Sequence, residues 1–106
     1  MHVLVAQLET VERHPDLPVK LFELFSSAKK LAQNWLSGNG SVSMAWKDVY
    51  LVHERDIFGT DPWAYGLKQN HHVIEKFLSY CYEQGISQTH IRPAELFHSS
   101  TWDLVD

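Results

Sequence analysis

The sequence predicts a mainly α-helical protein with three longer amphipathic helices, two short helices and one N-terminal strand that has no partner strand. Three observations support this fold class. In three separate stretches, apolar residues recur at intervals of three and four, which is the spacing of one helix face. Gly38, Gly59 and Gly85 follow these stretches and are typical helix ends. Only the opening residues form a short apolar run of the kind found in buried strands.

The opening segment, residues 1–8, is predicted to be the strand. A strand needs neighbours for its backbone hydrogen-bonding groups, and no second convincing strand follows in the chain. We therefore expect this segment to pair with another copy, to become helical or to fray. The helical body then covers residues 9–97 and begins with a short helix at residues 9–14, for which Thr10 is a candidate N-cap.

The longest helix is predicted over residues 16–37. Asp16 is a favourable N-cap residue, and Pro18 is tolerated in the first helical turn. Phe22 lies off the main apolar stripe and widens the face that we expect to be buried, so this helix should pack on two sides. The stripe consists of Leu17, Leu21, Leu24, Phe25, Ala28, Leu31, Ala32, Trp35 and Leu36.

A third helix is predicted over residues 43–58, after a flexible glycine- and serine-rich linker at residues 37–41. Gly59 is its expected end. The expected apolar face consists of Trp46, Val49, Tyr50, His53 and Ile57.

The best-specified helix begins at Leu67. Gly85 can adopt the left-handed conformation that ends a helix, and Ile86 is then placed to fold back on Cys81 as in a Schellman motif. The apolar face of this helix consists of Leu67, Ile74, Phe77, Leu78 and Cys81.

The last part of the chain is predicted to hold one short helix and a tail. Pro93 is acceptable as a first helical residue, so the short helix should run from there through Phe97. The tail, residues 98–106, contains Trp102, whose ring we expect to dock on the body of the protein. Residues 1–106 are thus predicted to form a single helical domain.

Composition excludes several classes of protein. The formal charge of −4 has the wrong sign for a nucleic-acid surface. No apolar run approaches the roughly 18 residues that a spanning helix needs, so no membrane insertion is predicted. The first residues lack the basic and apolar regions of a secretory signal, which predicts a cytoplasmic product for the chain as it stands. A parent protein with a signal upstream would instead be periplasmic.

Neither a metal nor a cofactor is predicted. His71 and His72 are adjacent and so point about 100° apart on a helix, which is unsuitable for binding one ion. His53 and Glu54 lack the HExxH spacing of a zinc site, and the chain has no phosphate loop or nucleophile elbow. Cys81, the single cysteine, falls on an apolar helix face and is predicted to be a buried thiol.

Aromatic rings gather just before the fourth helix. Trp63 and Tyr65, together with Tyr50, either line a slot for an aromatic ligand or pack in a core or interface, which is the more usual role of such rings. Asp61 is either a general base or a turn residue before Pro62.

A series of short motifs runs through the chain in a fixed order. They are Met1-His2-x-x-Val5, Arg13-His14-Pro15, Leu21 to Lys29, Asp61-Pro62-Trp63-x-Tyr65-Gly66-Leu67, Asn70, Phe77-Leu78-x-Tyr80, Glu83-Gln84-Gly85-Ile86 and Glu95-Leu96-Phe97. In these motifs the sequence resembles the C-terminal third of the 4,5-dihydroxyphthalate decarboxylase-like family. Members of that family are similar to the type II periplasmic solute-binding proteins of ABC importers. Ala64 departs from the family pattern, which has a second proline there.

The resemblance implies a two-lobed α/β parent, of which this chain is the C-terminal fragment and residues 1–8 are a hinge strand. It also implies that His2 faces the cleft between the lobes. Decarboxylation of an aromatic acid needs a held carboxylate and a proton delivered to the ring carbon, which a histidine supplies near pH 7. His2 is therefore the candidate catalytic residue, although a purely structural His2 is the alternative. Trp63 and Tyr65 are the candidate ligand-binding residues.

Three functions are open at this point. In the first, the parent decarboxylates an aromatic dicarboxylate and this chain, which supplies one wall of the site, is inactive alone. In the second, the parent is an ABC-importer solute-binding protein for a small organic anion. In the third, the chain is a stand-alone helical oligomerisation module. In every case, apolar helix faces without cover favour self-association into a dimer or higher oligomer.

Overall fold

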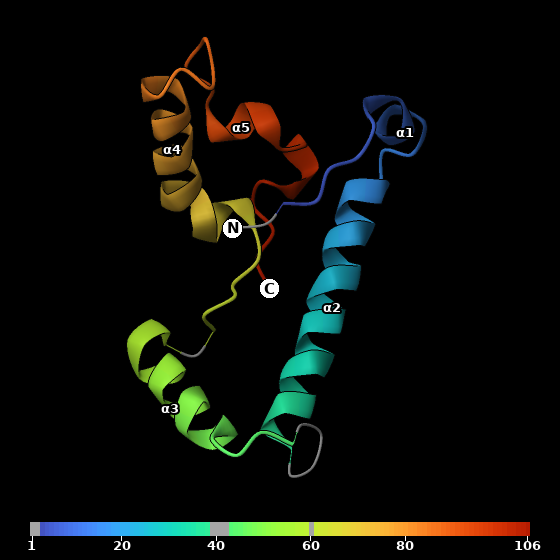
Figure 1. Ribbon diagram of the computed structural model, residues 1–106. Coiled ribbons are helices and arrows are strands. Elements are labelled where there is room, and N and C mark those ends of the chain that lie inside the picture. The colour runs from blue at the N-terminus through green and yellow to red at the C-terminus, as the bar shows by residue number, and fades with distance from the viewer. Residues whose placement is uncertain (1–2, 39–42, 60) are drawn as a thin grey trace.

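The computed structural model is built from helices joined by irregular segments (Figure 1). The structure describes residues 3–38, 43–59 and 61–106. Within these ranges no strand occurs, so the prediction of a mainly α-helical chain is confirmed. The elements are α1 (Leu8–Arg13), α2 (Leu17–Ser37), α3 (Lys47–Phe58), α4 (Leu67–Glu83), α5 (Pro93–Leu96) and the 3-10 turn η1 (Ser99–Thr101).

The predicted N-terminal strand is wrong for the residues that the structure describes. Residues 3–7 are irregular, and α1 already begins at Leu8. Val5, which should lie in a buried strand, is 84% exposed. The reason is physical, because residues 3–38, 43–59 and 61–106 contain no second strand that could share backbone hydrogen bonds with this segment. Thr10 lies inside α1 and is not its N-cap, a position held by Gln7.

The ends of α2 and α3 follow local signals. Asp16 stands at the N-cap position of α2, as predicted, but its side chain makes no capping hydrogen bond and instead pairs with Lys20. The predicted third helix starts later than expected, at Lys47, and ends before Gly59, whose φ of 82° suits a residue without a Cβ.

The predicted Schellman motif at the end of α4 is confirmed. The amide of Ile86 donates to the carbonyl of Cys81 at 2.8 Å, and the amide of Gly85 donates to the carbonyl of Tyr82 at 3.0 Å. Gly85 has a φ of 73°. The Ile86 side chain remains exposed, so the hydrophobic contact that often accompanies this motif is not made. Cys81 is a half-buried free thiol rather than the fully buried one expected.

The apolar core is small and lies on one side of α4. Its buried residues are Leu67, Ile74 and Leu78, and Ile91 and Phe97 pack against them. The short helix α5 lies against α4 at this place (Figure 1). This core holds the second half of the chain together but does not reach α3.

The chain is more open than a compact domain of its length. Its Cα radius of gyration is 17.0 Å, whereas a compact domain of this size has about 13 Å. Figure 1 shows α2 along one side, α4 and α5 at one end, and α3 at the other end. No helix in the described ranges has the length and apolar content needed to cross a membrane.

The face of α2 that packs inside the molecule is not the one that the apolar spacing predicted. Ser26 is buried, Lys29 has only 8% of its side chain exposed, and Gln33 is half-buried. Leu24 and Leu31, from the predicted stripe, are 62% and 59% exposed. The middle and second half of α2 thus turn polar side chains inward and most of the apolar stripe outward, and Lys29 there pairs with the carboxylates of Asp61 and Asp106.

The tail docks, but not through the residue that was expected. Trp102 is partly exposed, and its indole N–H donates to the nearby carbonyl of Phe97 at 2.9 Å. Instead, the backbone of Leu104 in the tail lies so close to Gly66 that a Cβ on Gly66 would overlap the carbonyl oxygen of Leu104. Beyond it, the Asp106 side chain is fully enclosed.

Gly66→Ala should therefore release the tail. Gly66 has a φ of 110° and no room for a methyl group. We therefore expect the substitution to lower the unfolding free energy by about 3 kcal/mol. Gly85→Ala is the matched control, because this glycine has positive φ with open space around it and should cost about 1 kcal/mol. Hydrogen exchange at the Tyr65 amide, which donates to Asp106, should accelerate only in Gly66→Ala; equal exchange in both variants would contradict this close packing.

Candidate functional site

The most elaborate side-chain arrangement in the described structure is a charged cluster where α2, the loop before α4 and the tail meet. Its centre is the Lys29 ammonium, which lies 2.7 Å from Asp61 Oδ2 and also pairs with Asp106 Oδ2. The Asp106 carboxylate is fully enclosed, whereas 30% of the Asp61 side chain is exposed. One cation thus balances two carboxylates from segments far apart in the sequence.

Backbone groups fix both carboxylates in place. Asp61 Oδ1 accepts hydrogen bonds from the amide of Trp63 at 3.1 Å and from the side chain of Gln33 at 3.3 Å. The first of these bonds is an Asx turn, which the Asp-Pro sequence favours. Asp106 Oδ1 accepts from the amide of Tyr65 at 2.8 Å. The tail is therefore tied both to α2 and to the loop before α4.

The Tyr65 ring adds a further contact to the same ammonium. Lys29 Nζ lies 4.7 Å from the ring centroid, within the range of a cation–π interaction, and donates to the carbonyl of Trp63 at 3.3 Å. Asn70 continues the network by donating to the carbonyls of Ala64 and Gly66. The Lys29 ammonium thus contacts two carboxylates, one backbone carbonyl and one aromatic ring of its own chain.

The cluster shifts two pKa values. Burial by itself would lower the pKa of Lys29, but the hydrogen bonds and charges of Asp106 and Asp61 outweigh it and raise this pKa above its ordinary value. Burial would raise the pKa of Asp61, but hydrogen bonds from Lys29 and the Trp63 amide outweigh it and lower this pKa. The ion pairs of charged Lys29 stabilise the fold fully below about pH 10, and this stabilisation is lost as pH rises through the raised pKa of Lys29. The interactions of ionised Asp61 stabilise the fold fully above about pH 4, and this stabilisation is lost as pH falls through the lowered pKa of Asp61.

These properties indicate a structural role for the cluster. A general base must be free to accept a proton near neutral pH, whereas the lowered pKa of Asp61 keeps its charge committed to Lys29. Of the two interpretations of Asp61, the turn residue agrees with the geometry. The cluster holds segments together, and both of its carboxylates are paired with Lys29.

Of the predicted site residues, His2 lies outside the described residues. Trp63 is 65% exposed, while the Tyr65 ring is half-buried with Lys29 against it. These two residues are close in the sequence, but neither lines the surface hollow between α2 and α3 or the surface hollow on α4. Tyr50 lies on α3, in the first of these hollows.

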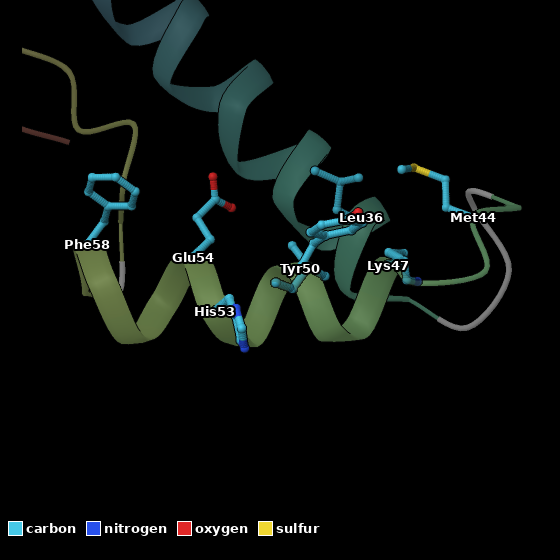
Figure 2. Close-up of a pocket in the computed structure, with 8 residues that line it drawn as sticks. Leu36, Met44, Lys47, Tyr50, His53, Glu54 and Phe58 are labelled. Carbon is cyan, nitrogen blue, oxygen red and sulfur yellow. The ribbon is translucent and has the colours of Figure 1, made fainter.

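That first hollow lies between the end of α2 and α3 and measures about 360 Å³ (Figure 2). It is open to solvent and mostly apolar, with Leu36, Tyr50 and Phe58 among its walls. Figure 2 shows Glu54 and Phe58 on the side of α3 that faces α2, whereas His53 points to the other side. His53 and Glu54 therefore do not form an acid–base pair.

The histidines of α4 do not form a metal site. His71 Nδ1 lies 3.9 Å from Glu75 Oε2, and both side chains are exposed. His72 lines a second shallow hollow with Phe77 and Tyr80. Across residues 3–38, 43–59 and 61–106, no three His, Cys, Asp or Glu side chains converge as they would around a metal ion.

Sequence reasoning missed Lys29 and Asp106. Lys29 lies off the apolar stripe of its helix, as a solvent-exposed lysine would, and Asp106 lies in a segment with no periodic pattern. The one available signal was the Asp61-Pro62 sequence, which indicated a turn but not that Asp61 pairs with Lys29.

Lys29→Met should test the structural role of the cluster. The substitution leaves Asp61 and Asp106 facing each other without a cation, so we expect a loss of about 3 kcal/mol in unfolding free energy. Lys30→Met is the matched control, because Lys30 is exposed on the same helix and should change stability by less than about 0.5 kcal/mol. Denaturant unfolding measures both, and equal stability of the two variants would show that the cluster contributes nothing.

A curated relative aligns with nearly the whole chain. It is 4,5-dihydroxyphthalate decarboxylase from Comamonas testosteroni, which is 34% identical over 103 residues, or 95% of this chain but 31% of the relative. No family model matches the sequence, and no solved structure does. The chain thus spans about a third of the length of the relative and resembles one part of that decarboxylase.

Proposed function

We propose that this chain is the C-terminal portion of a decarboxylase-like protein whose complete form removes a carboxylate from a dihydroxylated aromatic dicarboxylic acid. The observation that carries the proposal is the match itself, which runs through 95% of this chain and covers 31% of a protein named 4,5-dihydroxyphthalate decarboxylase. The complete form is proposed to have the two-lobed solute-binding architecture, with this chain in one lobe.

We further propose that the chain alone is inactive. A site for a small aromatic acid encloses most of its ligand, whereas the hollow at α3 and the hollow on α4 are open to solvent. The charged groups around Lys29 are already paired with one another. No cationic group of that cluster is therefore left to hold a substrate carboxylate, and the missing wall would come from the rest of the parent.

In the complete protein, His2 is the proposed proton donor. The bond between the ring carbon and the leaving carboxylate breaks, its electron pair stays on the ring carbon, and carbon dioxide leaves. The imidazolium of His2 then gives its proton to that carbon. The exposed ring of Trp63 is available as one wall of the aromatic slot, with Tyr65 beside it in the loop.

A chimera provides the sharpest test. The matching segment of the Comamonas testosteroni decarboxylase would be replaced by this chain, and carbon dioxide release from 4,5-dihydroxyphthalate would be measured. We expect the chimera to turn over and the purified chain of 106 residues to show no activity. In the chimera, His2→Asn should lower kcat by at least about a hundredfold, whereas the control His72→Asn, on the exposed side of α4, should not.

The outcomes separate the alternatives. A chimera that folds and binds the dicarboxylate but releases no carbon dioxide would contradict the decarboxylase proposal and favour solute binding. Turnover by the isolated chain comparable to that of the relative would contradict its proposed inactivity. Equal activity of His2→Asn and His72→Asn would remove His2 from the mechanism.

A further inference from the structure

The carboxylate of Asp106 is held in an enclosed pocket by groups from two other segments of the chain. Its Oδ1 accepts a hydrogen bond from the amide of Tyr65 at 2.8 Å, and its Oδ2 pairs with the Lys29 ammonium. The Asp106 side chain has no exposed surface, and only 8% of the Lys29 side chain is exposed. Each carboxylate oxygen thus has its own partner, one of them charged, which is how proteins hold and orient a carboxylate ligand.

Aromatic groups lie next to this pocket. The Lys29 ammonium is 4.7 Å from the centroid of the Tyr65 ring. Trp63, two residues earlier in the same loop, is 65% exposed, and its carbonyl accepts a hydrogen bond from Lys29 at 3.3 Å. A buried cation beside aromatic rings suits a ligand in which a carboxylate is attached to a ring.

The balance of charges makes Asp106 the more easily released of the two carboxylates. In the described part of the chain, Asp61 and Asp106 both form their ion pairs with the one ammonium of Lys29, which leaves one negative charge in excess. Enclosing a charge without a full counter-charge is costly. Asp61 has two further donors, a backbone amide and a glutamine side chain, whereas Asp106 has one, the Tyr65 amide.

The end of the tail is anchored at few points. The turn η1 lies against α2, and the indole of Trp102 donates to a backbone carbonyl at 2.9 Å. Beyond Trp102, the Val105 side chain is 52% exposed. Residues 103–106 are held mainly by the pocket around Asp106 and by the close approach of the tail backbone to Gly66. Local opening of this end can therefore occur while the rest of the tail stays docked.

We propose that Lys29 and the Tyr65 amide form a carboxylate-binding site, that Asp106 occupies this site as an internal ligand, and that the carboxylate of an aromatic acid replaces it when the end of the tail lifts. The choice of an aromatic acid rests on the proposed function, whereas the site rests on the geometry of the cluster. The docked tail blocks this site in the chain alone. A tethered group acts at an effective concentration in the millimolar range, so a free acid displaces Asp106 at similar concentrations.

Titration with phthalate, the unsubstituted aromatic dicarboxylate, tests the exchange. In nuclear magnetic resonance spectra of the labelled wild-type chain, the Tyr65 amide should shift with half-saturation in the millimolar range. The amides of Val105 and Asp106 should become more mobile in the same titration, because the end of the tail leaves. Dimethyl phthalate, the neutral ester, and sodium chloride at matched ionic strength are the controls and should leave Tyr65 unshifted.

Asp106→Asn tests whether the tail competes with the free acid. The variant keeps the size of the side chain and an oxygen for the Tyr65 amide but loses the charge that pairs with Lys29. Its half-saturation for phthalate should be at least about tenfold lower than that of the wild-type chain. The matched control is Asp103→Asn, an exposed carboxylate of the same tail, which should behave as the wild-type chain does.

Acetate tests the aromatic preference. It offers a carboxylate without a ring, so it should bind to the Asp106→Asn chain at least about tenfold more weakly than phthalate does. Equal affinities would exclude the aromatic part of the proposal and leave a general carboxylate site.

The other outcomes are equally decisive. A Tyr65 amide that responds to phthalate in neither the wild-type nor the Asp106→Asn chain would show that the cluster holds only its own tail, and would overturn the proposal. Equal half-saturation in Asp106→Asn and Asp103→Asn would show that Asp106 does not compete. Because these titrations use the chain alone, failure here beside an active chimera rejects this site and leaves the decarboxylase proposal standing. Binding here beside an inactive chimera does the reverse.

Discussion

The ion pairs of Lys29 determine how this chain is arranged. The apolar core lies between α4 and the segment around α5 and consists of very few residues, so it does not hold α2 in place. The Lys29 ammonium, paired with Asp61 and Asp106, links α2 to the loop before α4 and to the tail. A buried ion pair contributes little net stability compared with apolar packing, but leaving one of its charges unpaired is costly. The cluster therefore sets the orientation of α2 more than it adds stability.

This orientation explains the open shape of the molecule. Because the Lys29 face of α2 is turned inward, most of the apolar stripe of that helix is turned outward. Likewise, α3 exposes Val49 and Ile57, and its N-cap residue Trp46 is exposed. Such surfaces are uncommon on a self-sufficient domain. They agree with a sequence that matches only 31% of its relative.

The features that could be predicted from the sequence are those that depend only on neighbouring residues. Gly85 ends α4 as expected, because the left-handed conformation and the hydrogen bonds of a Schellman motif depend only on neighbouring residues. The strand at residues 1–8 was wrong for the described residues, because a strand depends on partners elsewhere. The apolar stripe of α2 was expected to be buried but is mostly exposed, because periodicity shows which face of a helix is apolar and not what covers it. The pairing of Lys29 with Asp106 had no sequence signal at all.

In the native chain α2 packs through Lys29, whereas Lys30 beside it is exposed to solvent. Brief acetylation of the native chain, with each lysine quantified by mass spectrometry, tests this most directly. Lys29, with 8% of its side chain exposed, should react far more slowly than the exposed Lys30, and unfolding the chain should abolish the difference. Equal reactivity of Lys29 and Lys30 in the native chain would contradict the account.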